Sequence, residues 1–132
     1  MRVSATKGNV IIRINDHIVE LPAPFENGFQ IQDKYIVLLN DRYSKSNILA
    51  FNSEGNLVWE VQENNFKHIK KGYELIYPRE KDLFVANILE TWYAIDANTG
   101  KIIMTYGDHQ KTIYYNQSSK FNWLKKLLKI FR

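Results

Sequence analysis

Two similar segments, residues 48–59 and 93–104, lie about 44 residues apart in this chain. Each begins with an apolar run, passes through a short polar stretch that ends at Gly55 or Gly100, and continues with a second apolar run. A glycine that closes a polar turn between two short apolar runs is typical of a β-hairpin. We therefore expect the same hairpin to occur twice, and this repetition limits the chain to repeated β architectures.

A weaker copy of the hairpin precedes these two segments. Residues 9–15 predict one strand, Asp16-His17 a tight turn, and residues 18–21 the partner strand, which Pro22 would end. Residues 9–21 therefore predict a third hairpin, near the N-terminus.

The spacing of the three copies predicts the architecture. Aligning Ile14, Phe51 and Ile95 gives intervals of 37 and 44 residues. Repeats of about 40 to 45 residues built from antiparallel hairpins are typical of β-propeller blades. The fold class that follows is all-β, a partial and open β-propeller of antiparallel meanders.

An earlier strand pair precedes each of the two later hairpins. Residues 28–32 and 35–39 form the first pair, and residues 73–77 and 83–87 form the second, with a turn expected at 78–82. The continuous apolar runs in 35–39 and 83–86 favour inner strands buried on both faces, whereas the alternation in 73–77 favours a half-exposed strand. The count is two four-stranded units and a partial first unit, about ten or eleven strands.

The strand ends and turns resemble the repeats of quinoprotein (PQQ-like) propellers over roughly residues 28–106. Ala94-Ile95-Asp96 with Thr99-Gly100-Lys101 matches the strand end and Thr-Gly turn of those repeats, and Met104 stands where they carry Trp. The other copy, Ala50-Phe51-Asn52 with Gly55, matches less closely but has Trp59 in place. The resemblance implies the propeller fold and implies no activity, because such repeats also occur in scaffolds without a cofactor.

Closed propellers have at least four blades, so about three blades leave exposed sheet faces and edges that must be covered. The cover could be the C-terminal segment, a second copy of the chain in a homodimer, or another protein. A fragment of a larger propeller is a further reading, which Met1 and the capped C-terminal helix disfavour. The expected domains are residues 1–119 as the partial propeller and residues 120–132 as a basic amphipathic helix packed on it.

That helix is predicted from spacing. Five apolar residues recur at steps of three or four along one face, with lysines largely opposite, and Ser118 or Ser119 can cap the N-terminus. The apolar residues are Phe121, Leu124, Leu127, Leu128 and Phe131. The helix could pack on the body, fill a groove of a partner, or lie on an anionic membrane surface.

Charge is unevenly distributed along the chain. The net formal charge is +4, and residues 120–132 contribute five basic residues and no acid, so the remaining residues carry −1. A nearly neutral body does not favour nucleic-acid binding, which needs clustered Lys and Arg. No cysteine is present, and the first residues lack the apolar core of a signal peptide, so we expect a cytoplasmic protein.

No catalytic, metal-binding or cofactor-binding constellation stands out. His17, His68 and His109 are scattered without metal-ligand spacing, and the carboxylates fall mainly at predicted turns, where Asp and Asn are favoured. The Asp108-His109 dipeptide is the one acid–base candidate. We therefore expect a protein that is not an enzyme and has no cofactor.

Aromatic and basic residues outside the repeat are the candidates for protein binding, because Tyr and Trp are enriched at binding hot spots. They are Lys111, Tyr114, Tyr115, Lys125, Lys126 and Lys129. Small β-rich proteins without a catalytic set are typical of bacterial immunity proteins, which bind and neutralise a toxin. We expect this function, with a toxin domain as the protein partner. The alternative is a peripheral membrane or scaffold protein anchored by the basic helix.

Overall fold

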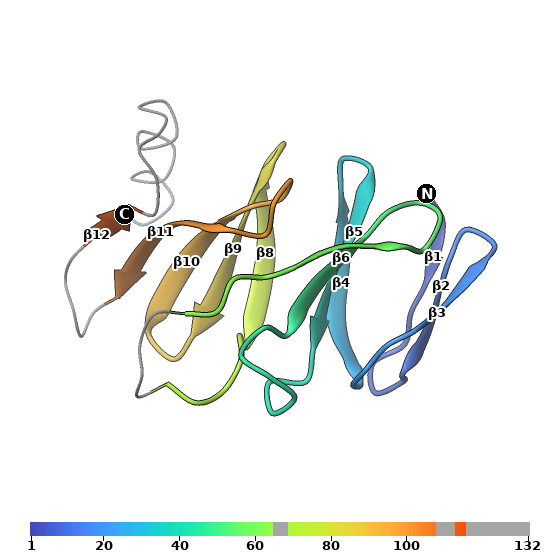
Figure 1. Ribbon diagram of the computed structural model, residues 1–132, viewed down its shortest axis with the longest axis horizontal. Coiled ribbons are helices and arrows are strands. Elements are labelled where there is room, and N and C mark those ends of the chain that lie inside the picture. Colours follow the sequence, from blue (N-terminus) through green and yellow to red (C-terminus); the bar gives the residue numbers. More distant parts are fainter. Residues whose placement is uncertain (65–68, 108–112, 116–132) are drawn as a thin grey trace.

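Twelve β-strands and no helix make up the part of the chain that the computed structural model describes, residues 1–64, 69–107 and 113–115 (Figure 1). The predicted all-β class is confirmed in these residues. The predicted C-terminal helix, residues 120–132, lies outside the described residues.

The strands form three antiparallel sheets in chain order. Sheet 1 contains β1 (Val3–Ser4), β2 (Ile11–Ile14) and β3 (His17–Glu20), in that order. Sheet 2 contains β4 (Phe25–Ile31), β5 (Lys34–Leu39), β6 (Ile48–Phe51) and β7 (Leu57–Glu60). Sheet 3 contains β8 (Leu75–Glu80), β9 (Leu83–Ile88), β10 (Thr91–Asp96), β11 (Ile102–Gly107) and β12 (Ile113–Tyr115).

Each sheet is a simple meander, because neighbouring strands in the sheet are also neighbours in the sequence. The three sheets follow one another in a row, with sheet 2 between sheet 1 and sheet 3 (Figure 1). The first strands of sheets 2 and 3, β4 and β8, contact each other. The chain thus forms three antiparallel meanders, one after another.

Side chains fill the two spaces between the sheets. Sheet 1 contributes Ile12, Ile14 and Val19 to one core cluster, which also contains Leu21, just after β3, and Val37, Leu39, Leu49 and Phe51 of sheet 2. The second cluster joins the other face of sheet 2 to sheet 3, and includes Ile36, Leu38, Phe84, Ala86 and Ile95. Successive residues of β5 therefore enter different clusters, and this strand is buried on both faces, as its continuous apolar run predicted.

Trp59 of β7 links sheet 2 to the following sheet. Its indole N–H donates a hydrogen bond of 2.9 Å to the carbonyl oxygen of Ala97, in the turn between β10 and β11. A Cβ atom on Gly100 in the same turn would lie 2.5 Å from the indole. Glycine is therefore required here both by this contact and by a φ of +74°.

The first two sheets meet in a similar way. A Cβ atom on Gly55, in the turn between β6 and β7, would lie 3.1 Å from Val19 of β3. Val19 pairs with Ile12, and Trp59 pairs with Ala50. In each case the last strand of one sheet contacts the hairpin turn of the next sheet.

In sheet 1 the structure differs by one residue from the predicted alignment of the three hairpins. Ile14 faces sheet 2, whereas Phe51 and Ile95 face the preceding sheet. The turn in sheet 1 is Asn15-Asp16, so His17 is the first residue of β3 instead of part of the turn. A slip of one residue moves every side chain to the opposite face, which accounts for the difference.

Three further strand predictions differ from the structure. The two-residue strand β1 and the strand β12 were not expected. Pro78 lies within β8 and not in a turn. Because β8 is an edge strand of sheet 3, a missing backbone N–H is tolerated there.

Candidate protein-binding surface

Strand β12 carries the two tyrosines predicted to bind a protein. Its backbone pairs with β11, and Tyr114 and Tyr115 lie opposite Thr105 and Met104. β12 is the outermost strand of sheet 3 among the described residues. The two tyrosines therefore extend the repeated sheet by one strand, and they occupy its edge.

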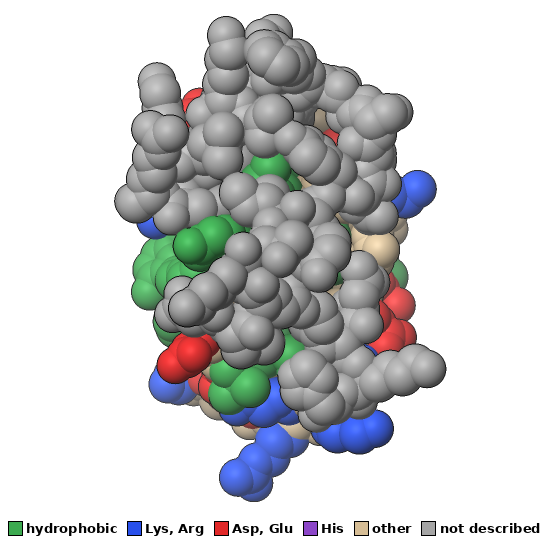
Figure 2. Space-filling model, turned by 90° about the vertical axis from the view of Figure 1, so that its left-hand side faces the viewer, with side chains coloured by type: hydrophobic (Ala, Val, Ile, Leu, Met, Phe, Trp, Pro, Cys, Tyr) green, Lys and Arg blue, Asp and Glu red, His purple; other side chains and the backbone are tan. Residues whose placement is uncertain are grey.

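The four predicted binding lysines, Lys111, Lys125, Lys126 and Lys129, lie outside the described residues. The structure brings Tyr114 and Tyr115 together on one strand. Hydrophobic side chains of described residues are visible from the side shown in Figure 2.

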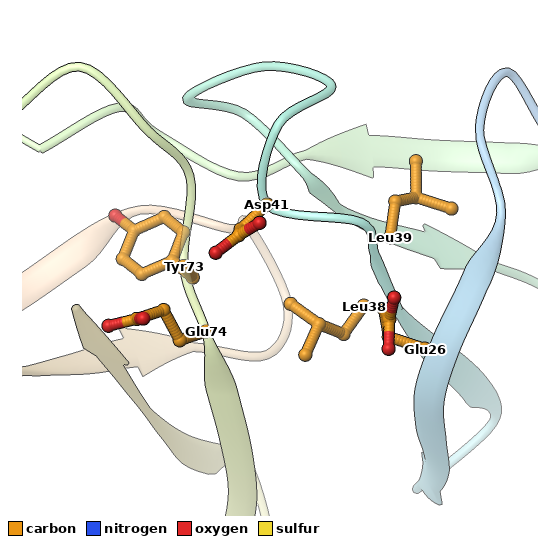
Figure 3. A pocket seen from close by; sticks show the side chains of 6 residues that line it. All are labelled: Glu26, Leu38, Leu39, Asp41, Tyr73 and Glu74. Atoms are coloured by element: carbon orange, nitrogen blue, oxygen red, sulfur yellow. The ribbon is translucent and has the colours of Figure 1, made fainter. Parts of the chain in front are cut away.

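A hollow of about 260 Å³ opens between sheets 2 and 3. Glu26 of β4, Leu38 and Leu39 of β5, Asp41, Tyr73 and Glu74 line it. Figure 3 shows Tyr73 and Glu74 on one side, Glu26 and the leucines on the other, and Asp41 between them. The polar lining is mainly acidic.

Ion pairs and backbone hydrogen bonds engage the carboxylates of this hollow. Lys71 Nζ lies 2.7 Å from Glu74 and 3.4 Å from Asp41. Glu74 also accepts a hydrogen bond of 2.7 Å from the backbone N–H of Leu89. This hydrogen bond lowers the pKa of the Glu74 carboxyl, and the hydrogen bond from Lys71 lowers it further. The hydrogen bond to Glu74 in turn raises the pKa of Lys71. Glu74 thereby links the start of β8 to the turn after β9.

Tyr73, which lines the hollow, packs against a second buried tyrosine, Tyr93. The rings of Tyr73 and Tyr93 meet edge to face, with centroids 5.2 Å apart. Burial raises the pKa of both phenols, so both remain protonated at neutral pH. The Tyr73 hydroxyl donates to the carbonyl oxygen of Gln62, which gives it a structural role.

Asn47 fixes this region from the side of sheet 2. Its buried amide donates hydrogen bonds of 2.8 Å to the carbonyl oxygens of Leu39 and Tyr73, and its oxygen accepts one of 2.7 Å from the Tyr73 N–H. The sequence did not single out Asn47, because an Asn beside a predicted strand is usually part of a turn.

The described part of the chain has no group of three or more His, Asp or Glu residues able to hold a metal ion. His17 is exposed on β3, and Asp108 and His109 lie outside the described residues. Nor do the described residues contain a helix long and apolar enough to cross a membrane.

Residues 1–106 match a family model described as a domain of unknown function, DUF7957. Comparisons with curated proteins and with solved structures gave no match.

Proposed function

The chain belongs to this DUF7957 family, and we propose that it is a non-catalytic protein-binding module, a bacterial immunity protein that binds a toxin domain. The observation that carries the proposal is the position of Tyr114 and Tyr115 on β12, at the edge of a sheet held in place by buried contacts. Two tyrosines on the edge strand of a sheet suit stoichiometric binding, since tyrosine is enriched among the residues that dominate binding energy.

We further propose that the three sheets are blades of a partial propeller. The repeated contact between the last strand of one sheet and the turn of the next supports this reading, as does the contact between β4 and β8. In this arrangement the first strands would line the axis, and β7 and β11 would lie toward the outside.

The function is tested with the protein encoded next to the gene of this chain. Co-expression should restore growth that the neighbouring protein inhibits, and the two purified proteins should form a complex whose titration ends at a fixed, stoichiometric ratio. Neutralisation by far less than one equivalent would indicate turnover and overturn the non-catalytic reading. Failure to form any complex would overturn the immunity proposal.

The binding surface is tested by changing Lys111, Tyr114 and Tyr115 together to alanine. Affinity for the same protein should fall at least tenfold, and the remaining basic residues should make association faster at low salt. The matched control is Arg13→Ala with Ile18→Ala, two exposed side chains of sheet 1, which should bind as the wild type does.

The alternative function is a peripheral membrane or scaffold protein anchored by the basic segment 120–132. A single basic amphipathic helix binds membranes weakly, so this alternative needs a second anchoring signal. Co-sedimentation with phosphatidylglycerol vesicles, abolished by changing Lys125, Lys126 and Lys129 to glutamate, would favour it over the immunity function.

A further inference from the structure

The face of sheet 3 that is turned away from sheet 2, here called the outer face, is largely apolar. Phe84, Ala86 and Ile88 belong to the core between the two sheets. Because side chains alternate along a strand, Leu83 and Val85 face the other way. Both are fully buried, although they belong to neither of the two core clusters.

The strand register extends this outer face into two rows that cross the whole sheet. The first row joins the register partners Tyr77, Val85, Ala94, Met104 and Tyr115. The second joins Leu75, Asn87, Trp92, Tyr106 and Ile113. Nine of these ten positions are apolar or aromatic, and the small Ala94 lies at the centre of the first row.

Met104 occupies the position that contacts the following sheet elsewhere in the molecule. Ala94 pairs with Met104 in sheet 3 as Ala50 pairs with Trp59 in sheet 2 and Ile12 with Val19 in sheet 1. Val19 and Trp59 each meet a turn of the next sheet. Sheet 3 therefore has a face built to receive a further layer.

The chain itself supplies an occupant of suitable length. Seventeen residues, 116–132, follow β12 at the edge of this sheet, and their apolar positions recur with helical spacing. A helix of residues 120–132 would be about 20 Å long at 1.5 Å per residue. Five strands about 4.8 Å apart span about 19 Å, so one helix can cross the entire sheet.

We propose that residues 116–132 dock on the outer face of sheet 3, in the place that a fourth sheet would take. Phe121, Leu124 and Leu127 face the two rows, with the helix lying across the strands over Ala94. Lys125, Lys126 and Lys129 then point away from the sheet.

This docking deepens the proposed function, on which this step rests, because it gathers the three predicted lysines of the tail into one basic surface over sheet 3. The partner chemistry that fits such a surface is an acidic patch on a protein. The docking itself is tested without any partner, so its failure is distinct from a failure of the immunity function.

Disulfide formation in the full-length chain tests the docking, since the natural sequence contains no cysteine. Ala94→Cys is combined in turn with Leu124→Cys, Leu127→Cys and Lys126→Cys, and the rate of oxidation within one chain is measured by mass spectrometry. At least one leucine position should react ten times faster than position 126, which lies on the opposite side of the helix.

Two further pairs keep the test decisive. Tyr77→Cys replaces Ala94→Cys at the 40% exposed end of the same row, in case the central position does not tolerate the change. Ile18→Cys, on the exposed face of sheet 1, serves as the matched control and should not react with Leu127→Cys. Equal rates at all tail positions, faster reaction with position 18, or disulfides formed between chains alone would overturn the proposal.

Discussion

At the scale of single residues, the contact between Trp59 and Gly100 gives the most direct prediction. Gly100→Ala should lower the free energy of unfolding by about 2 kcal/mol or more, because a left-handed conformation costs an L-residue about 1–2 kcal/mol and the new Cβ would also meet the indole. Urea denaturation measures the change. Gly8→Ala is the control: its φ is +92° but nothing lies within 4 Å, so it should lose less stability.

Asn47 is the second residue whose replacement should be costly. Asn47→Ala leaves the carbonyl oxygens of Leu39 and Tyr73 and the N–H of Tyr73 without this partner. Unpaired buried polar groups cost about 1–3 kcal/mol each, so we expect a total loss of about 3 kcal/mol or more. Thermal unfolding of this variant is compared with that of the exposed Asn56→Ala, and equal melting temperatures for the two would contradict the bridging role of Asn47.

At the scale of elements, local sequence predicted the hairpins well because their turns have a clear chemical signature. Asn52 and Asp96 each accept hydrogen bonds from backbone N–H groups of their own turns, and Gly55 and Gly100 have positive φ. Strands β1 and β12 have two and three residues, too few to show a periodic pattern. Pro78 suggested a turn, since the position of β8 at a sheet edge is a tertiary property.

The candidate surface was predictable only in part, for the same reason. Tyr114 and Tyr115 stood out as aromatic residues beyond the repeat, but their place beside β11 depends on pairing with Thr105 and Met104. The alignment of Ile14 with Phe51 and Ile95 was wrong by one residue because the turn of sheet 1 is shorter than the others. Short-range chemistry is visible in the sequence, whereas the partners of an element are not.

The link between the start of β8 and the turn after β9 predicts a pH dependence. Because the pKa of Glu74 is lowered on folding, its contribution is present above the unfolded-state pKa and is lost as pH falls through the folded value. Wild-type protein should therefore lose stability below about pH 4.5, near the ordinary carboxyl pKa. In Glu74→Gln the difference between urea midpoints at pH 6 and pH 3.5 should be smaller.

The matched control for this pH effect is Glu54→Gln, an exposed carboxyl in the turn between β6 and β7. It should retain the wild-type difference between the two midpoints. If Glu74→Gln also retained that difference, the ion pair with Lys71 and the hydrogen bond from Leu89 would contribute nothing to folding.

At the scale of the whole molecule, three sheets in a row have two terminal faces, and the two differ. The terminal face of sheet 1 carries Ile11 and Ile18 beside Arg13 and Glu20, and its two isoleucines are 55% and 66% exposed. The outer face of sheet 3 has two apolar rows and is followed by an amphipathic segment. The turn in sheet 1 is short and lacks the glycine that receives Val19 or Trp59 elsewhere, so the row is suited to end at sheet 1 and to be covered at sheet 3.

Removing residues 120–132 should therefore affect the whole molecule. Each large apolar side chain that loses its burial on sheet 3 costs about 1.5–3 kcal/mol, a large share of the 5–15 kcal/mol typical of a small domain. The truncated protein should unfold at lower urea and self-associate in analytical ultracentrifugation, because the rows around Ala94 become accessible. The full-length variant with Lys125, Lys126 and Lys129 changed to glutamate keeps the apolar positions and should remain stable and monomeric. A truncated protein that unfolds at the wild-type urea concentration and stays monomeric would mean that the segment serves a partner and does not cover the sheet.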